Sequence, residues 1–207
     1  MTIAYPLTHP TSPGFSRASF MPRSVVGMSQ SPFTLQQQVY DWNAAIWVVQ
    51  LDLPQMRRAQ AEDWVGFLLS LRGRKGTFYL GDPDAKIPRG IATGTAVVSG
   101  TNAARATSLV TTGWTPSQTG ILKRGDYLSL GTGTTKRLYK NLTDTNSGTG
   151  GAATFDIYPP LRETLTGGDA ITVGTATGAF RLTDNTTQWD TNEMSVYGLS
   201  FTAIEAL

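Results

Sequence analysis

The chain has 207 residues, of which 40% are hydrophobic and only 15% are charged, and its net charge is +2. It is long enough to bury a core, but its charged fraction is below the roughly 25% usual for soluble domains. The absence of cysteine excludes disulfides, thiol nucleophiles and cysteine-ligated zinc, and the single histidine, His9, excludes a metal site with two histidine ligands.

The basic residues are scattered and form no stripe of the kind that binds nucleic acid, so we expect no sequence-specific nucleic-acid binding. No apolar run reaches the roughly 18 residues that a membrane span needs. The N-terminus shows no basic segment followed by an apolar one, so we expect synthesis in the cytoplasm without a signal peptide.

Residues 1–30 hold several prolines interleaved with aromatic and apolar residues. Proline forbids a helix interior and weakens a central strand, while the apolar residues argue against simple disorder. Two interpretations stay open for this segment: an extended arm that lies on a neighbouring molecule, or a flexible leader.

The segment Phe33–Trp42 alternates apolar and polar residues with a period of two, which predicts a strand. Asp41, Trp42 and Asn43 offer turn chemistry, and Ala45–Leu53 then predicts a second strand with two partly apolar faces.

Asp52 and Pro54 suit the start of a helix and Gly73 suits its end, so we predict one amphipathic helix over residues 55–72. Five apolar residues at helical spacing are its predicted core: Met56, Trp64, Phe67, Leu68 and Leu71. A short strand, Thr77–Leu80, and a turn containing Asp82 and Asp84 follow.

From Gly90 the composition shifts to Gly, Thr, Ala and Val, with turn residues between six short predicted strands. Their expected ranges are 96–98, 108–111, 127–130, 137–140, 153–158 and 170–173. Two further strands, Gly178–Leu182 and Met194–Ala206, close the chain. The last strand needs a sheet to join, and the first part of the chain offers one.

The order of the predicted strands and helix along the chain indicates a mainly β protein with one principal α-helix. We expect a split-barrel or β-sandwich domain made of residues 31–89 and 175–207, preceded by the segment 1–30. A small β-barrel or β-sandwich domain, residues 90–174, is expected to be inserted into it.

The chemistry-bearing residues form no recognisable catalytic pattern. Asp126, Asp156 and Glu163 are the carboxylates that a glycosidase would need as a pair, but their spacing shows no convergence. We therefore expect no enzyme, no catalytic residue, no cofactor and no metal. The alternative is a carbohydrate-binding β module for attachment to host-surface glycans, with Trp114, Tyr127 and Tyr139 as candidate glycan contacts, because aromatic faces stack on sugars.

The order of these blocks resembles the tail-tip and baseplate proteins of tailed bacteriophages, and in particular the distal tail proteins. The resemblance covers roughly residues 30–207. It rests on three runs, in chain order: Trp42…Leu53-Pro54…Trp64…Phe67-Leu68…Leu71-Arg72-Gly73…Gly76-Thr77-Phe78…Gly81-Asp82-Pro83; Leu122…Gly125-Asp126-Tyr127-Leu128…Phe155-Asp156-Ile157-Tyr158-Pro159-Pro160-Leu161-Arg162; and Tyr197…Ser200-Phe201…Glu205-Ala206-Leu207.

The resemblance implies a structural virion protein that forms a hexameric ring between the tail tube and the tip or baseplate complex. The first domain would make the ring and the inserted β domain would lie at its periphery. Implied partners are further copies of the chain, the tail tube protein and the tail hub or tip proteins. The implied location is the virion.

Overall fold

The structure, a computed structural model, describes residues 3–191 and 196–207. Strands dominate this part of the chain, and it holds one α-helix, α1 (Arg58–Ser70), with two short 3-10 turns, η1 (Gly73–Lys75) and η2 (Gly133–Thr135). The predicted fold class, mainly β with one principal helix, is confirmed. The described residues contain no helix long and apolar enough to cross a membrane.

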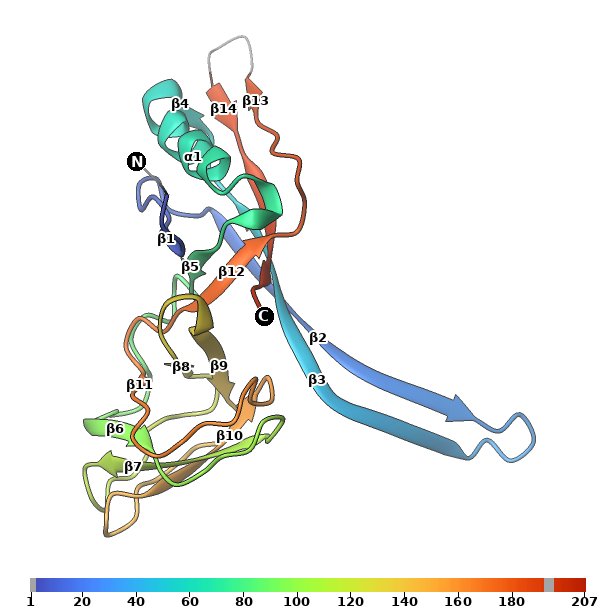
Figure 1. The fold of residues 1–207 in the computed structure, drawn as a ribbon, viewed down its shortest axis with the longest axis vertical. Coiled ribbons are helices and arrows are strands. Elements are labelled where there is room, and N and C mark those ends of the chain that lie inside the picture. The colour runs from blue at the N-terminus through green and yellow to red at the C-terminus, as the bar shows by residue number, and fades with distance from the viewer. Residues whose placement is uncertain (1–2, 192–195) are drawn as a thin grey trace.

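The first sheet joins the two ends of the chain, and α1 lies beside it (Figure 1). Its six strands, in spatial order, are β1 (Leu7–Thr8), β5 (Phe78–Leu80), β12 (Gly178–Leu182), β15 (Ser200–Glu205), β3 (Gln37–Asp52) and β2 (Arg17–Gln30). A smaller sheet near the helix has the order β13 (Asp190–Thr191), β14 (Val196–Gly198) and β4 (Met56–Arg57).

The helix is shorter at its start than predicted, because Met56 and Arg57 pair with Tyr197 and Val196 and so belong to a strand. The helix consequently begins at Arg58 rather than directly after Pro54. Its end is closer to the expectation: Arg72 and Gly73 both adopt the left-handed conformation that stops a helix.

The core under α1 also receives the N-terminal residues. The Tyr5 hydroxyl donates to the Ser70 carbonyl at 2.7 Å, and the Trp64 indole N–H donates to the Pro13 carbonyl at 3.2 Å. The His9 ring stacks on the Trp64 ring, with centroids 5.8 Å apart. The start of the described chain is therefore packed on its own helix.

The second sheet is a nearly closed barrel whose strands all lie, in sequence, between β5 and β12. In spatial order they are β11 (Ile171–Thr172), β8 (Tyr127–Leu130), β9 (Arg137–Asn141), β10 (Ala153–Tyr158), β7 (Ser108–Trp114) and β6 (Gly94–Val98). A bridge between Val97 and Ala170, with a Val98 N–H to Asp169 carbonyl bond of 2.8 Å, joins the two edge strands. The barrel has its own buried apolar cluster.

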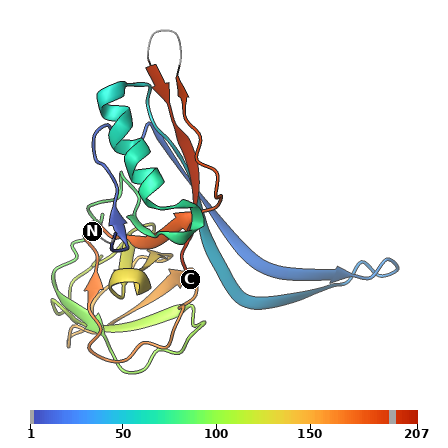
Figure 2. The ribbon, with the colours of Figure 1, turned by 45° about the horizontal axis from the view of Figure 1, so that its top comes forward.

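The most conspicuous element is the hairpin of β2 and β3, which leaves the first sheet and projects far from the body of the molecule (Figures 1 and 2). The turn predicted at Asp41–Asn43 is wrong. β3 runs through it as one strand with a bulge, and the chain reverses at residues 31–36 instead. The predicted last strand is divided into β14 and β15, and Met194 lies outside the described residues.

Candidate functional site

The outer part of the hairpin, residues 25–44, is here called the arm. It begins beyond the pair Ser24–Ala45, where the register shifts and Asn43 adopts a φ of 46°. The Asn43 N–H donates to Asp41 Oδ1 at 2.8 Å, so the bulge is held by a side chain. Such a bulge bends the strand pair, and the hairpin curves away from the body at about this level (Figure 1).

The two faces of the arm carry different kinds of apolar side chain. Residues that are paired across the strands share a face, so Val26, Met28 and Val39 form an aliphatic face. On the other face the Trp42 ring lies against Gly27, where an added Cβ would come within 2.9 Å of it, and Tyr40 is paired with that glycine. These five large side chains are all exposed.

The edges of the arm are open as well. β15 pairs with β3 only from Val48 to Asp52, and no strand of the described residues pairs with the outer edge of β2. Natural proteins usually protect an open edge with Lys, Pro or inward charges. Asp41 is the one charged residue of the arm, and no Lys or Arg is present in it.

The tip of the arm is an ordered turn. The Ser31 N–H donates to the Gln36 carbonyl at 2.9 Å, and the Leu35 N–H donates to the Ser31 carbonyl at 3.0 Å. The Ser31 hydroxyl oxygen accepts the N–H groups of Phe33 and Thr34 at 3.4 and 3.3 Å. This turn presents the Phe33 side chain, which is 94% exposed.

A groove of about 420 Å³ lies at the base of the arm, between the hairpin and the barrel. Phe20, Pro22, Trp47, Tyr127, Tyr158 and Leu142 line it, with Lys140. The Trp47 ring meets the Tyr158 ring edge-to-face at 5.3 Å and the Phe20 ring at 6.0 Å. We call this cavity the base groove.

The cation in the base groove is held over an aromatic ring. Lys140 Nζ lies 4.4 Å from the centroid of the Tyr127 ring and donates to the Tyr127 hydroxyl at 3.1 Å. Burial raises the pKa of Tyr127, and the nearby Asp82 carboxylate raises it further, so the phenol stays neutral.

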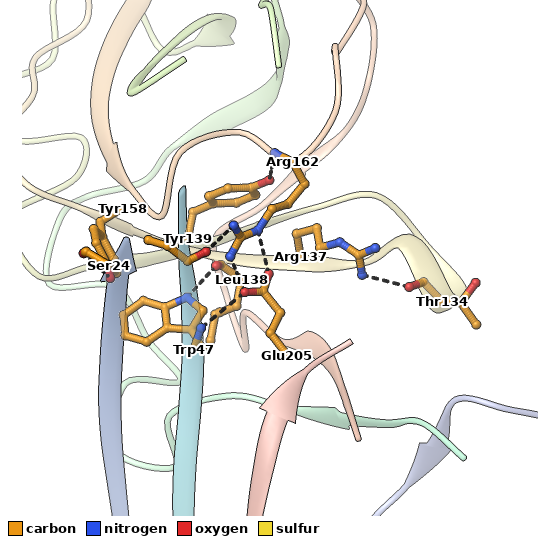
Figure 3. A network of polar contacts seen from close by, with 10 residues as sticks. Ser24, Trp47, Thr134, Arg137, Leu138, Tyr139, Tyr158, Arg162 and Glu205 are labelled. Carbon is orange, nitrogen blue, oxygen red and sulfur yellow. Dashed lines mark hydrogen bonds and ion pairs between the residues drawn. The ribbon is translucent and has the colours of Figure 1, made fainter. Parts of the chain in front are cut away.

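A buried polar network fixes the arm's base to the barrel (Figure 3). The Arg162 guanidinium, next to β10, forms a bidentate ion pair with Glu205 of β15 and donates to the Ala45 carbonyl. The Trp47 indole N–H donates to the Leu138 carbonyl of β9 at 2.9 Å. The side chains of Arg162 and Glu205 are only 12% and 0% exposed, so the pair is shielded from water.

The predicted helix-core residues all lie in the core of the first sheet, although Met56 contributes from β4. The predicted glycan contacts are also buried: Trp114 is 3% exposed, Tyr127 4% and Tyr139 2%. Tyr127 lines the base groove. The structure does not bring the three rings together, since Trp114 and Tyr139 belong to the barrel core and Tyr127 to the core of the first sheet.

Two of the three carboxylates considered for hydrolysis, Asp126 and Asp156, have structural contacts, and the third, Glu163, is exposed. Asp126 is buried and accepts the N–H groups of Arg89, Gly90 and Lys123 at 2.8 to 2.9 Å, which fixes the connection into the barrel. Asp156 accepts from the Thr143 hydroxyl at 3.3 Å. The described residues contain no group of three side chains placed to hold a metal ion.

The arm, the base groove and the Arg162–Glu205 pair were not predicted. The alternating pattern of Phe33–Trp42 indicated a strand, but nothing local showed that it pairs with Val26–Gln30 and leaves the body. The absence of Lys and Arg from residues 25–44 was the available signal.

No protein-family model matches the chain, and a search of curated proteins finds no significant match.

Proposed function

We propose that this protein is a structural, non-catalytic component of a bacteriophage tail. Copies of the chain assemble into a hexameric ring that joins the tail tube to the tip or baseplate complex. Its partners are other copies of itself, the tail tube protein and the tail hub or tip proteins, and its location is the virion. The observation that carries the proposal is the arm.

The arm has the properties of a segment that is covered in its working state. Both of its faces expose large apolar side chains, both of its edges are open, and it has one charge in 20 positions. A contiguous apolar surface of this kind marks an interaction site on a soluble protein. A lone two-stranded ribbon is also marginally stable in water, so a neighbouring chain would stabilise it.

The arm offers enough surface for a stable contact. An aromatic side chain buries about 150–250 Å², and the arm exposes Phe33, Tyr40 and Trp42 together with five aliphatic side chains. Together they approach the roughly 800 Å² that one partner contributes to an interface of standard size.

The arm is also compatible with head-to-tail contacts between copies of the chain. It projects from one side of the body, so a neighbour that receives it uses a different surface (Figure 2). Such head-to-tail contacts close into a ring when the rotation between neighbours allows it. The low charge of the whole chain suits a protein whose faces are covered in an assembly.

Negative-stain microscopy of the purified protein at high concentration tests this proposal. We expect closed rings whose class averages have sixfold symmetry. A chain that stays monomeric at the highest concentration, also after addition of the tail tube protein, would contradict it.

A further inference from the structure

We infer that the base groove is the receptor for the arm of the next copy, and that Phe33 at the tip is the side chain that enters it. This inference rests on the proposed ring and specifies its contact. Each chain then carries both halves of a head-to-tail contact. The tip lies at one end of the arm, and the groove lies at the other end.

The tip has the form of a rigid knob. Five hydrogen bonds within residues 30–36 hold the turn, among them Gln30 Nε2 to the Leu35 carbonyl at 3.3 Å. Leu35 adopts a φ of 58°, a conformation that costs free energy for a residue with a side chain. An ordered turn loses little entropy when it binds, which favours affinity.

The groove matches this knob in size and chemistry. Its walls are aromatic and aliphatic, and its volume of about 420 Å³ accommodates a phenylalanine side chain with part of its turn. Aromatic rings prefer edge-to-face contacts of the kind already present between Trp47 and Tyr158. Lys140 contributes a cation to the wall of the groove, and a cation attracts the face of an uncharged aromatic ring.

The occupant is the tip of another copy rather than the chain's own tip. The arm points away from the body of the molecule (Figures 1 and 2), and the groove lies at the base of the arm. β2 continues for six residues beyond Ser24, which lines the groove, so it carries the turn at least about 20 Å from the groove at about 3.3 Å per strand residue. Lys140 is the one cation among the lining residues, which disfavours a ligand with several phosphates.

The distance between the tip and its own groove also sets the distance between neighbouring grooves in the ring. An arm that spans from its own groove to the next one places neighbouring grooves at least about 20 Å apart. In a sixfold ring the distance between neighbours equals the radius, so the grooves lie at least about 20 Å from the axis.

The test uses two variants of the full chain, each of which removes one half of the contact. Phe33→Glu places a charge on the tip, and Leu142→Glu places one in the groove, where Leu142 is 45% exposed. Matched controls are Ile87→Glu, 83% exposed and outside the arm, and Val110→Glu, 41% exposed and outside the groove. Pro22→Glu is a second groove variant in case Leu142→Glu does not fold.

Sedimentation velocity measures the self-association of each variant. Each of the two variants alone is expected to self-associate at least about 30-fold more weakly than wild type, because a buried aromatic anchor of an interface is lost. The controls are expected to assemble like wild type. An equal mixture of the two variants is expected to form dimers and nothing larger, since one intact tip meets one intact groove.

Three results separate the inference from the proposed function. If Phe33→Glu or both groove variants assemble like wild type, the inference is wrong and the ring proposal stands. If each variant is monomeric but their mixture forms no dimer, the tip and the groove do not bind each other. If wild type does not associate even after addition of the tail tube protein, the proposed function fails together with the inference.

Discussion

Trp64 connects three parts of the first core: the helix, the N-terminal residues and the sheet. Its side chain is fully buried, its indole N–H is bonded to Pro13, and its ring contacts those of His9, Phe15 and Phe201. We predict that Trp64→Ala lowers the unfolding free energy by about 3–5 kcal/mol. Denaturant unfolding measures it, with the exposed helix residue Leu69 as the control. Leu69→Ala should cost less than about 1 kcal/mol, and equal losses would contradict the packing described here.

The Arg162–Glu205 pair is a buried ion pair between the barrel and the first sheet. Glu205→Ala would leave a guanidinium buried without its partner, so we predict a loss of about 3–5 kcal/mol in unfolding free energy. Replacing both residues by methionine removes the unpaired charge, and most of that loss should be recovered. A double variant that is less stable than the single one would show that the pair contributes more than charge balance.

Tyr139 makes the stability sensitive to alkaline pH. Burial raises its pKa to about 12, against 10.0 for an ordinary tyrosine. Between these values the unfolded chain loses the phenolic proton while the folded protein keeps it, so stability is complete below pH 10 and falls as the pH rises towards 12. The loss should be on the order of 2–3 kcal/mol.

Unfolding of wild type and Tyr139→Phe across this pH range isolates the contribution of Tyr139. All other ionisable groups are the same in both proteins, so the difference between the two curves reports the Tyr139 phenol. Parallel curves would show that this phenol does not titrate differently in the folded and unfolded states.

At the scale of elements, we expect that removal of the arm leaves the unfolding free energy of the body nearly unchanged. Ser24 and Ala45 are paired across the hairpin, so an Asn-Gly turn in place of residues 25–44 can close it there. We predict that this armless chain keeps its unfolding free energy within about 1 kcal/mol of wild type. A much larger loss, measured by denaturant unfolding, would mean that the arm supports the body rather than a neighbouring chain.

Elements with a local pattern could be predicted from the sequence. Tyr127–Leu130, Ala153–Tyr158 and Gly178–Leu182 are strands with the predicted bounds, because turn residues delimit each alternating or apolar run. The start of the helix could not be predicted, since Met56 joins β14 through Tyr197, far along the chain. Pro22 argued against a helix and a central strand, and β2 is an edge strand, where proline costs little.

The candidate site was less predictable than the fold, because its parts meet only in three dimensions. Arg162 and Glu205 are 43 positions apart, and Trp47 and Leu138 are 91 apart. The aromatic residues chosen as sugar contacts lie on barrel strands, where their large rings are buried in the two cores.

At the scale of the whole molecule, two β units are joined by a polar network, and one of them extends a hairpin that nothing in the described chain covers (Figures 1 and 3). Exposed faces and open edges on the same segment are a hazard for a monomer, since they invite uncontrolled association. A closed ring removes that hazard by giving every arm one defined place.

Sedimentation velocity of wild type and the armless chain at equal concentration tests this central claim most directly. We predict assemblies for wild type and a monomer of unchanged stability for the armless chain. Identical sedimentation of the two proteins would contradict it, because the arm would then not be the element that holds the copies together.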